Sequence, residues 1–117
     1  MSYLDFFYEI AKIPRPSYSC GRIADYLCDL AEKRGLSFVR DGADNVIIKK
    51  NATAGYESSP AVMLQGHTDM VWCVADGRDI DVENGVTVVN DGEWLRADGT
   101  TLGADNGIAV AYMLDLL

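Results

Sequence analysis

Histidine is nearly absent from this chain of 117 residues, which contains only His67. A metal site built mainly from imidazoles is therefore excluded within the chain, and His67 would need carboxylate partners to hold a cation. Cysteine is also scarce, and the three that occur, Cys20, Cys28 and Cys73, lack the number and spacing of a disulfide-stapled secreted domain. This pattern favours reduced thiols and a cytoplasmic setting.

The chain also has few basic residues and no long apolar run. Ten Lys and Arg residues against 18 Asp and Glu residues give a net charge of -8, so the summed field repels nucleic acid and anionic lipid. The longest uncharged apolar run, Ile108–Leu114, is far too short to cross a membrane, and the N-terminus lacks a basic region before an apolar run. We therefore expect neither nucleic acid nor a membrane as a partner.

The remaining composition, 49% hydrophobic and 24% charged, is typical of one compact domain with a core of its own. Two helices are predicted near the N-terminus. The first starts at a capping box of Ser2 and Asp5, stops before Pro14, and carries an apolar stripe of Leu4, Phe7, Tyr8 and Ala11. The second follows the stiff connector 13–17, includes Cys20 and Cys28, and closes at Gly35.

From residue 36 the apolar period changes to that of strands. Residues 36–40 and 46–48 form a predicted strand pair across the polar turn 41–45, and residues 61–64 form the most apolar strand, expected in the middle of a sheet. Short strands at 81–83, 86–89 and 93–96 predict a small β meander with an Asn84-Gly85 turn. A helix begins at Asp105. The predicted fold class is α/β, with a mixed central sheet flanked by helices.

Two glycine-framed motifs carry the chemistry. The run GHTDMV at residues 66–71 would place His67 at the C-terminal end of the central strand, where ligand-binding loops of open α/β sheets collect. Asp69 lies two residues further on, so in extended chain it points to the same side as His67. The run TLGADNG at residues 101–107 holds Asp105 between glycines that permit unusual dihedrals and close backbone approach.

Imidazole and carboxylate are ligands that zinc takes, so His67 and Asp105 are the candidate metal ligands, with Asp69 beside them. Each residue also has a simpler interpretation. His67 and Asp69 can belong to a surface turn, and Asp105 can be the N-cap of a helix. Cys73 is more typical of a small buried hydrophobe than of a metal ligand. Trp72 and Trp94 are interpreted as packing residues.

The motifs together resemble the two-zinc metallopeptidases that include aminoacylases, carboxypeptidase G and bacterial dipeptidases. Within them the resemblance is to the aminoacyl-histidine dipeptidase branch, also described as Xaa-His dipeptidase, cytosol non-specific dipeptidase or peptidase D. The resemblance rests on PRPS at 14–17, GHTDMV at 66–71 and, above all, ADGTTLGADNG at 97–107. The chain departs from the pattern at Cys20, where an acidic residue is expected, and at 72–77, where a longer stretch is expected. The second departure concerns substrate preference.

The resemblance implies that His67 binds one zinc ion, that Asp105 bridges two, and that Asp69 acts in catalysis by orienting a metal-binding group. It also implies a cis peptide bond between Asp105 and Asn106, two zinc ions as cofactors with cobalt or manganese as alternatives, and dipeptides as substrates. A homodimer is implied for the full-length protein.

The resemblance further implies that residues 1–117 are the N-terminal portion of the catalytic domain. The remaining ligands, the general base and a lid or dimerisation domain would lie outside the chain, which alone would be inactive. Two alternatives stay open: a related two-zinc deacylase or aminopeptidase, and a non-catalytic small domain.

Overall fold

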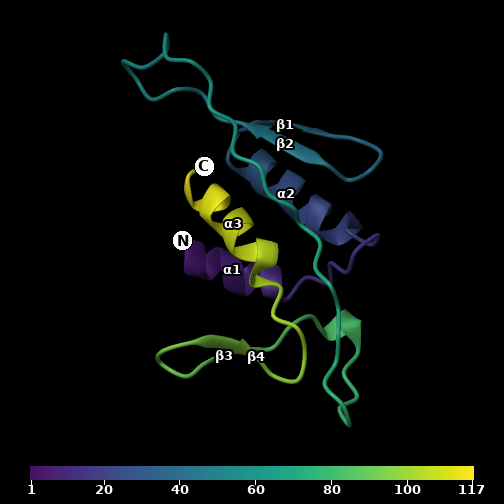
Figure 1. Cartoon of the computed structure of the whole chain (residues 1–117). Helices are drawn as coiled ribbons and strands as arrows, with labels where there is room; N and C mark the ends of the chain where they lie inside the picture. The colour runs from purple at the N-terminus through teal and green to yellow at the C-terminus, as the bar shows by residue number, and fades with distance from the viewer. The chain divides into compact units, whose positions relative to one another are not determined.

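The computed structural model describes all 117 residues and contains three helices, four strands and one short 3-10 helix (Figure 1). The helices are α1 (Tyr3–Ala11), α2 (Gly21–Lys33) and α3 (Ala104–Asp115), and the 3-10 helix is η1 (Val82–Asn84). The strands are β1 (Ser37–Arg40), β2 (Val46–Lys49), β3 (Val88–Asn90) and β4 (Leu95–Ala97). The predicted α/β class is confirmed.

The chain divides into two compact units. The first unit comprises Met1–Ile23 and Gly66–Leu117, and the second comprises Ala24–Gln65. All three predicted site residues belong to the first unit. None of the helices is long and apolar enough to span a bilayer.

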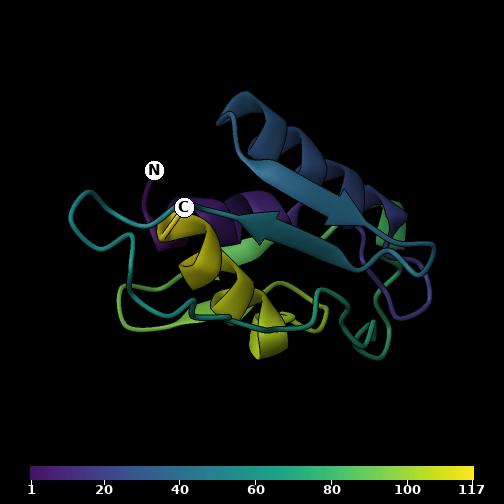
Figure 2. The ribbon, with the colours of Figure 1, turned by 90° about the horizontal axis from the view of Figure 1, so that it is seen from above.

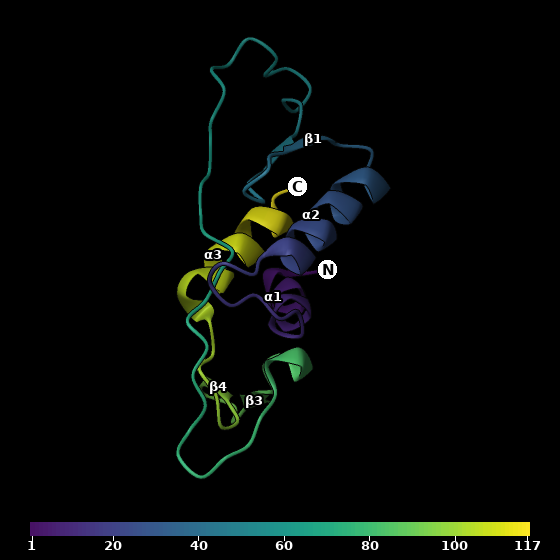
Figure 3. The same ribbon diagram turned by 90° about the vertical axis from the view of Figure 1, so that its right-hand side faces the viewer.

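Helix α1 begins at the predicted capping box. The Asp5 amide donates to Ser2 Oγ at 3.4 Å, and the Ser2 amide donates to Asp5 Oδ2 at 2.7 Å. The predicted apolar stripe was partly wrong, because Leu4 is 38% exposed while the buried residues are Phe6, Phe7, Ile10 and Ala11. Helix α1 packs against α3, which lies beside it in two views (Figures 2 and 3), and Ala11 also belongs to a buried cluster with Met70 and Val86. Tertiary packing of α1 therefore selects its buried face.

Helix α3 contributes the other half of this packing. Its buried residues are Gly107, Val110, Ala111 and Leu114, a set spaced at three and four residues as expected for one helix face. Where the start of α1 meets the last turn of α3, the rings of Tyr3 and Tyr112 stack with centroids 4.6 Å apart. The α1–α3 pair is the scaffold from which the site loops extend.

The predicted three-stranded meander was wrong in its first strand. Residues 82–84 form η1, because Asp81 caps it by accepting from the Glu83 amide at 2.9 Å. Gly85 does not form a hairpin turn; it ends η1 at φ 66° and lies against the backbone of Lys12. The adjacent Val86 amide donates to Ala11 O at 2.8 Å. Only β3 and β4 pair, in antiparallel register.

The second unit contains α2 from Ala24 onward, and the predicted strand pair follows this helix. Strands β1 and β2 are antiparallel, with Arg40 opposite Val46, and their arrows run in opposite directions in Figure 2. The turn is held by Asp41, whose Oδ1 accepts from the amides of Ala43 and Asn45 at 2.9 Å each. Helix α2 ends before Gly35 at φ 68°, as predicted. Cys20 lies one residue before α2 and is not within it.

The predicted central strand at residues 61–64 is wrong. The segment after β2 runs on as chain without helix or strand (Figure 3), and Val62, Met63 and Leu64 are 85%, 79% and 55% exposed. The structure has two separate two-stranded sheets in place of one central sheet. An apolar run becomes a strand only when neighbouring strands satisfy its backbone groups, and residues 1–117 supply no such neighbour here.

Candidate metal centre

His67 lies between the two predicted carboxylates. Its Nε2 is 3.0 Å from Asp105 Oδ1, and its Nδ1 is 3.1 Å from both Asp69 Oδ1 and the Asp69 carbonyl oxygen. The structure thus brings together all three residues singled out in the sequence, although Asp105 is 38 positions from His67.

Every atom that faces the imidazole nitrogens is a hydrogen-bond acceptor, so the protonated ring donates from both nitrogens. Desolvation alone would lower the pKa of His67, but the hydrogen bonds to Asp105 and Asp69 outweigh it and raise the pKa above 6.5. The proton on Nε2 therefore occupies the position between imidazole and carboxylate that a cation would take.

Asp69 is itself held in place. Ser17 Oγ donates to Asp69 Oδ2 at 2.5 Å, while Asp69 Oδ1 accepts from His67. The hydrogen bond from Ser17 is the main cause that lowers the pKa of Asp69, and the His67 ring adds to it. Asp69 is thus an anion with one oxygen for Ser17 and one for the imidazole.

Asp105 is at the start of α3 but does not cap it. The N-cap is Gly103, which makes no side-chain capping bond, and the dihedrals of Asp105 and Asn106 are not helical. The side chain of Asp105 is 94% exposed and its one hydrogen bond goes to His67. The interpretation of Asp105 as an N-cap is therefore wrong. The predicted cis peptide bond between Asp105 and Asn106 is present.

Glycines allow the two site loops to approach. A Cβ at Gly66 would lie 2.9 Å from Met113 Cε and 3.1 Å from Asn106 Nδ2, so the GHTDMV run lies close against the side chains of α3 at this glycine. Gly103 has φ 73°, and a Cβ there would lie 2.6 Å from Met70 Sδ. The close approach predicted for the glycine-rich motif is confirmed.

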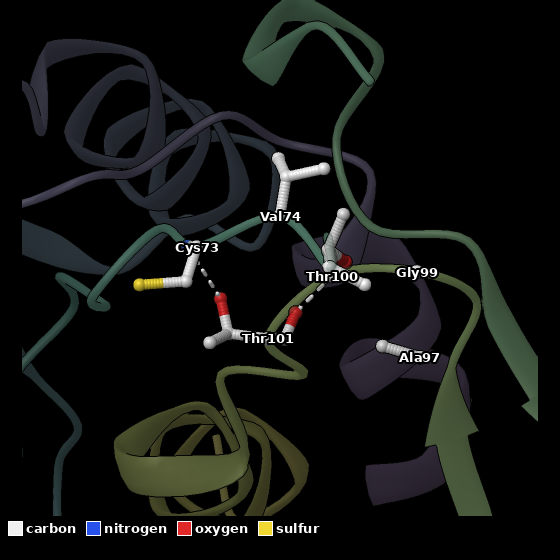
Figure 4. A pocket seen from close by; sticks show the side chains of 7 residues that line it. Cys73, Val74, Ala97, Gly99, Thr100 and Thr101 are labelled. Carbon is white, nitrogen blue, oxygen red and sulfur yellow. Dashed lines mark hydrogen bonds between the residues drawn. The ribbon is translucent and has the colours of Figure 1, made fainter. Parts of the chain in front are cut away.

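The side chain of Thr101 joins the same two runs further along. Thr101 Oγ1 donates to Val71 O at 2.7 Å and accepts from the Cys73 amide at 3.2 Å, and the Thr101 amide donates to Cys73 O at 3.0 Å. Figure 4 shows Cys73 and Thr101 at a shallow hollow lined also by Val74, Ala97, Gly99 and Thr100. None of the three site residues lines this hollow, which lies where the two runs are hydrogen-bonded to each other.

The side chains of His67 and Asp105 have the chemistry and the separation that two ligands of a divalent cation need. Two zinc ligands at about 2.1 Å in tetrahedral geometry are roughly 3.4 Å apart. The 3.0 Å between His67 Nε2 and Asp105 Oδ1 is close to that separation. Asp69 on the opposite nitrogen provides the carboxylate partner that fixes the tautomer of metal-binding histidines. No group of three or more His, Cys, Asp or Glu side chains within residues 1–117 could hold a metal ion.

Two residues of this region had no role assigned from sequence. Arg15 and Ser17 belong to the PRPS run, yet their partners in the site are 88, 53 and 52 positions away, so no local pattern indicates the contacts. Cys73 is exposed, which corrects the expectation of a buried residue. Trp72 packs against the cluster of Ala11, Met70 and Val86, whereas Trp94 is 59% exposed and is not a packing residue.

Comparison with known proteins gives two relatives of the same kind. The chain is 43% identical over 67 residues to the cytosol non-specific dipeptidase of Escherichia coli (strain K12), covering 57% of this chain and 14% of that protein. It superposes on the crystal structure of aminoacylhistidine dipeptidase from Vibrio alginolyticus with a TM-score of 0.92 and 42% identity, covering 97% of this chain. No family model matches.

The chain spans 24% of the length of the Vibrio alginolyticus structure and 14% of the Escherichia coli protein, so the likeness concerns a segment of each. Within that segment both sequence and backbone agree. The resemblance to the aminoacyl-histidine dipeptidase branch, inferred from the PRPS, GHTDMV and TTLGADNG runs, is confirmed for this chain.

Proposed function

We propose that this chain is the N-terminal part of the catalytic domain of a metal-dependent dipeptidase, acting on Xaa-His or a broader range of dipeptides. The observation that carries the proposal is His67 Nε2 at 3.0 Å from Asp105 Oδ1, with Asp69 on Nδ1. It is supported by the 42% identity to an aminoacylhistidine dipeptidase over 97% of the chain.

In this proposal His67 would hold one metal ion through Nε2, and Asp105, whose carboxylate is open to solvent, would be shared by two. When bound, zinc ions polarise the scissile carbonyl and activate water as the nucleophile. Asp69 keeps the proton on Nδ1, so that Nε2 presents its lone pair outward. Cobalt or manganese can replace zinc at ligands of this type.

Two ligands are too few for a stable zinc site, which needs four in a closed site or three with an open position. The proposal therefore places the remaining ligands and the general base outside residues 1–117, and the isolated segment is expected to be inactive. A homodimer and a cytosolic location, the latter taken from the printed name of the Escherichia coli relative, complete the proposal.

The test uses the natural gene product that contains this sequence. We expect elemental mass spectrometry to find two zinc ions per chain. We also expect the protein to hydrolyse dipeptides and to lose this activity when a chelator removes the metal. His67→Ala and Asp105→Ala should lose metal, whereas Asp69→Asn should lose about 10- to 100-fold in metal affinity or activity. Asp76→Asn, an exposed turn carboxylate outside the site, should behave as wild type.

The substrate panel separates the alternatives. Preference for N-acyl amino acids would favour a deacylase, and cleavage of tripeptides as fast as dipeptides would favour an aminopeptidase. A natural gene product that binds no metal and cleaves none of these substrates would contradict the enzyme assignment and favour a non-catalytic domain.

A further inference from the structure

Arg15 is a buried cation that the proposed reaction does not use. Its side chain is 1% exposed, yet no carboxylate contacts it. Nη1 donates to Thr68 O at 2.9 Å and Nη2 donates to Gly103 O at 2.7 Å, while Nε has no partner. Burial lowers the pKa of Arg15, and the nearby Cys20 and Asp69 act in the opposite direction.

The two acceptors belong to the two site loops. Thr68 lies between His67 and Asp69, and Gly103 precedes Asp105 by two residues. The donors of a guanidinium have a fixed, planar spacing, so one Arg15 side chain sets the separation of two backbone segments. The fork leaves no room for side chains, because a Cβ at Gly103 or Gly107 would lie 2.7 Å from Nη2.

The backbone around Arg15 holds the same loop. The Met70 amide donates to Arg15 O at 3.0 Å, and the Ser17 amide donates to Met70 O at 3.2 Å. Ser17 Oγ then reaches Asp69 Oδ2 at 2.5 Å. The connector thus contacts the His67 loop through backbone, through Arg15 and through Ser17, and the Asp105 loop through Arg15.

A role in packing alone does not account for these contacts. Burying a charge without a counter-ion is unfavourable, and an apolar side chain of similar length would fill the same space without that cost. The buried fork provides two directed hydrogen bonds to carbonyls that flank the metal-binding pair, which an apolar residue cannot provide.

We propose that Pro14–Ser17 is a positioning segment for the metal centre, in which Arg15 fixes the separation of the His67 and Asp105 loops and Ser17 orients Asp69. This inference rests on the proposed function, because the positioned atoms are the proposed metal ligands. Arg15 and Ser17 are positioning residues and contact neither the substrate nor the ions.

The decisive variant is Arg15→Met in the natural gene product, loaded with cobalt. We expect the affinity for cobalt, measured by chelator competition, to fall about tenfold or more, as for other groups that orient metal ligands. The visible absorption bands of bound cobalt should change as well. Arg15→Lys should resemble Arg15→Met, because one ammonium is a point charge and cannot hold both carbonyls at a set spacing.

Leu114→Ala is the matched control for lost stability. Leu114 is 2% exposed on α3 and follows Gly107, the α3 residue beside the fork, by seven positions, so the variant should unfold at lower urea while its cobalt affinity and spectrum stay those of wild type. Unchanged affinity and spectrum in Arg15→Met would overturn the positioning role. Tighter cobalt binding in Arg15→Met would overturn it too, since the charge would then act by repelling the ion.

If Arg15→Met does not fold, Ser17→Ala tests the segment, because Ser17 is exposed. We expect kcat to fall about tenfold with KM unchanged, and Ser17→Thr, which keeps the hydroxyl, to restore it. Wild-type kcat in Ser17→Ala would contradict the proposal. A wild-type protein that binds no cobalt and cleaves no dipeptide would instead overturn the proposed function, so the two failures are distinguishable.

Discussion

At the residue scale, the site depends on how one imidazole uses its two nitrogens. Both nitrogens of His67 face carboxylates, and in the protonated ring Nε2–H donates to Asp105 Oδ1. A metal ion at the same position would have to displace that proton, so metal affinity should rise with pH. Asp69 keeps its contact with Nδ1 in either state.

A first prediction concerns the titration of His67 in the metal-free protein. Because its pKa is raised, the charged ring stabilises the fold below about pH 6.5, and this contribution is lost as pH rises through the folded-state pKa. In residues 1–117 His67 is the single histidine, so NMR of its ring reports the titration without overlap. We expect a pKa above 6.5, which Asp105→Asn lowers.

Asp76→Asn serves as the control for this titration, since it removes a charge from an exposed turn that does not contact the ring. It should leave the His67 pKa within a few tenths of wild type. An equal drop in Asp76→Asn and Asp105→Asn would mean that net charge, not the hydrogen bond to Asp105, sets the pKa.

Single residues were predictable from sequence where a motif names them. His67, Asp69 and Asp105 stand in glycine-framed runs, and the structure brings all three together. The contacts of Arg15 and Ser17 were not predictable, because each depends on chain closure over 50 or more positions. The sequence also does not distinguish a buried arginine from one on the surface, so it gives no sign that Arg15 is buried.

At the scale of secondary-structure elements, Gly85 holds the segment of η1 and β3 against the end of α1. Its backbone, at φ 66° and ψ -164°, is in a region that only glycine adopts readily. A Cβ there would lie 2.5 Å from Lys12 O, a backbone atom that cannot move away as a flexible side chain could. The contact places η1 and the following β3 beside the end of α1.

We predict that Gly85→Ala lowers the free energy of unfolding by about 1–3 kcal/mol, from dihedral strain and the clash with Lys12. Urea unfolding followed by circular dichroism measures it. The matched control is Gly42→Ala, because Gly42 has no atom within 4 Å of its Cβ position and no positive φ. Equal effects in the two variants would contradict the structural role of Gly85.

Elements were predictable where local periodicity and caps agree. The capping box of α1, the Gly35 end of α2 and the β1–β2 pair all follow from short-range signals. The signal failed at Asn84-Gly85, where a capping aspartate and contact with Lys12 favour a 3-10 turn. The local signal also failed at residues 61–64. Apolar composition indicates that a segment can form a strand, but the strand forms only if neighbouring strands are present to pair with it.

At the scale of the whole molecule, two features lack partners within residues 1–117. The proposed metal-binding residues, His67 and Asp105, offer two ligands, and the apolar run 62–64 has neither strand partners nor cover. The chain also spans 24% of a solved relative. These features support the proposal that the chain acts as part of a larger catalytic domain.

The last prediction follows from the apolar run. Residues 1–117 expressed alone should self-associate through Val62, Met63 and Leu64, since an exposed apolar segment with unpaired backbone groups is a template for intermolecular pairing. Salt should strengthen the association by screening the net charge of -8. Met63→Lys should remove most of it in sedimentation velocity, whereas Tyr56→Lys, at a residue 64% exposed in the same segment but outside the apolar run, should not. Equal loss in both variants would show that added charge alone, and not the apolar run, governs the association.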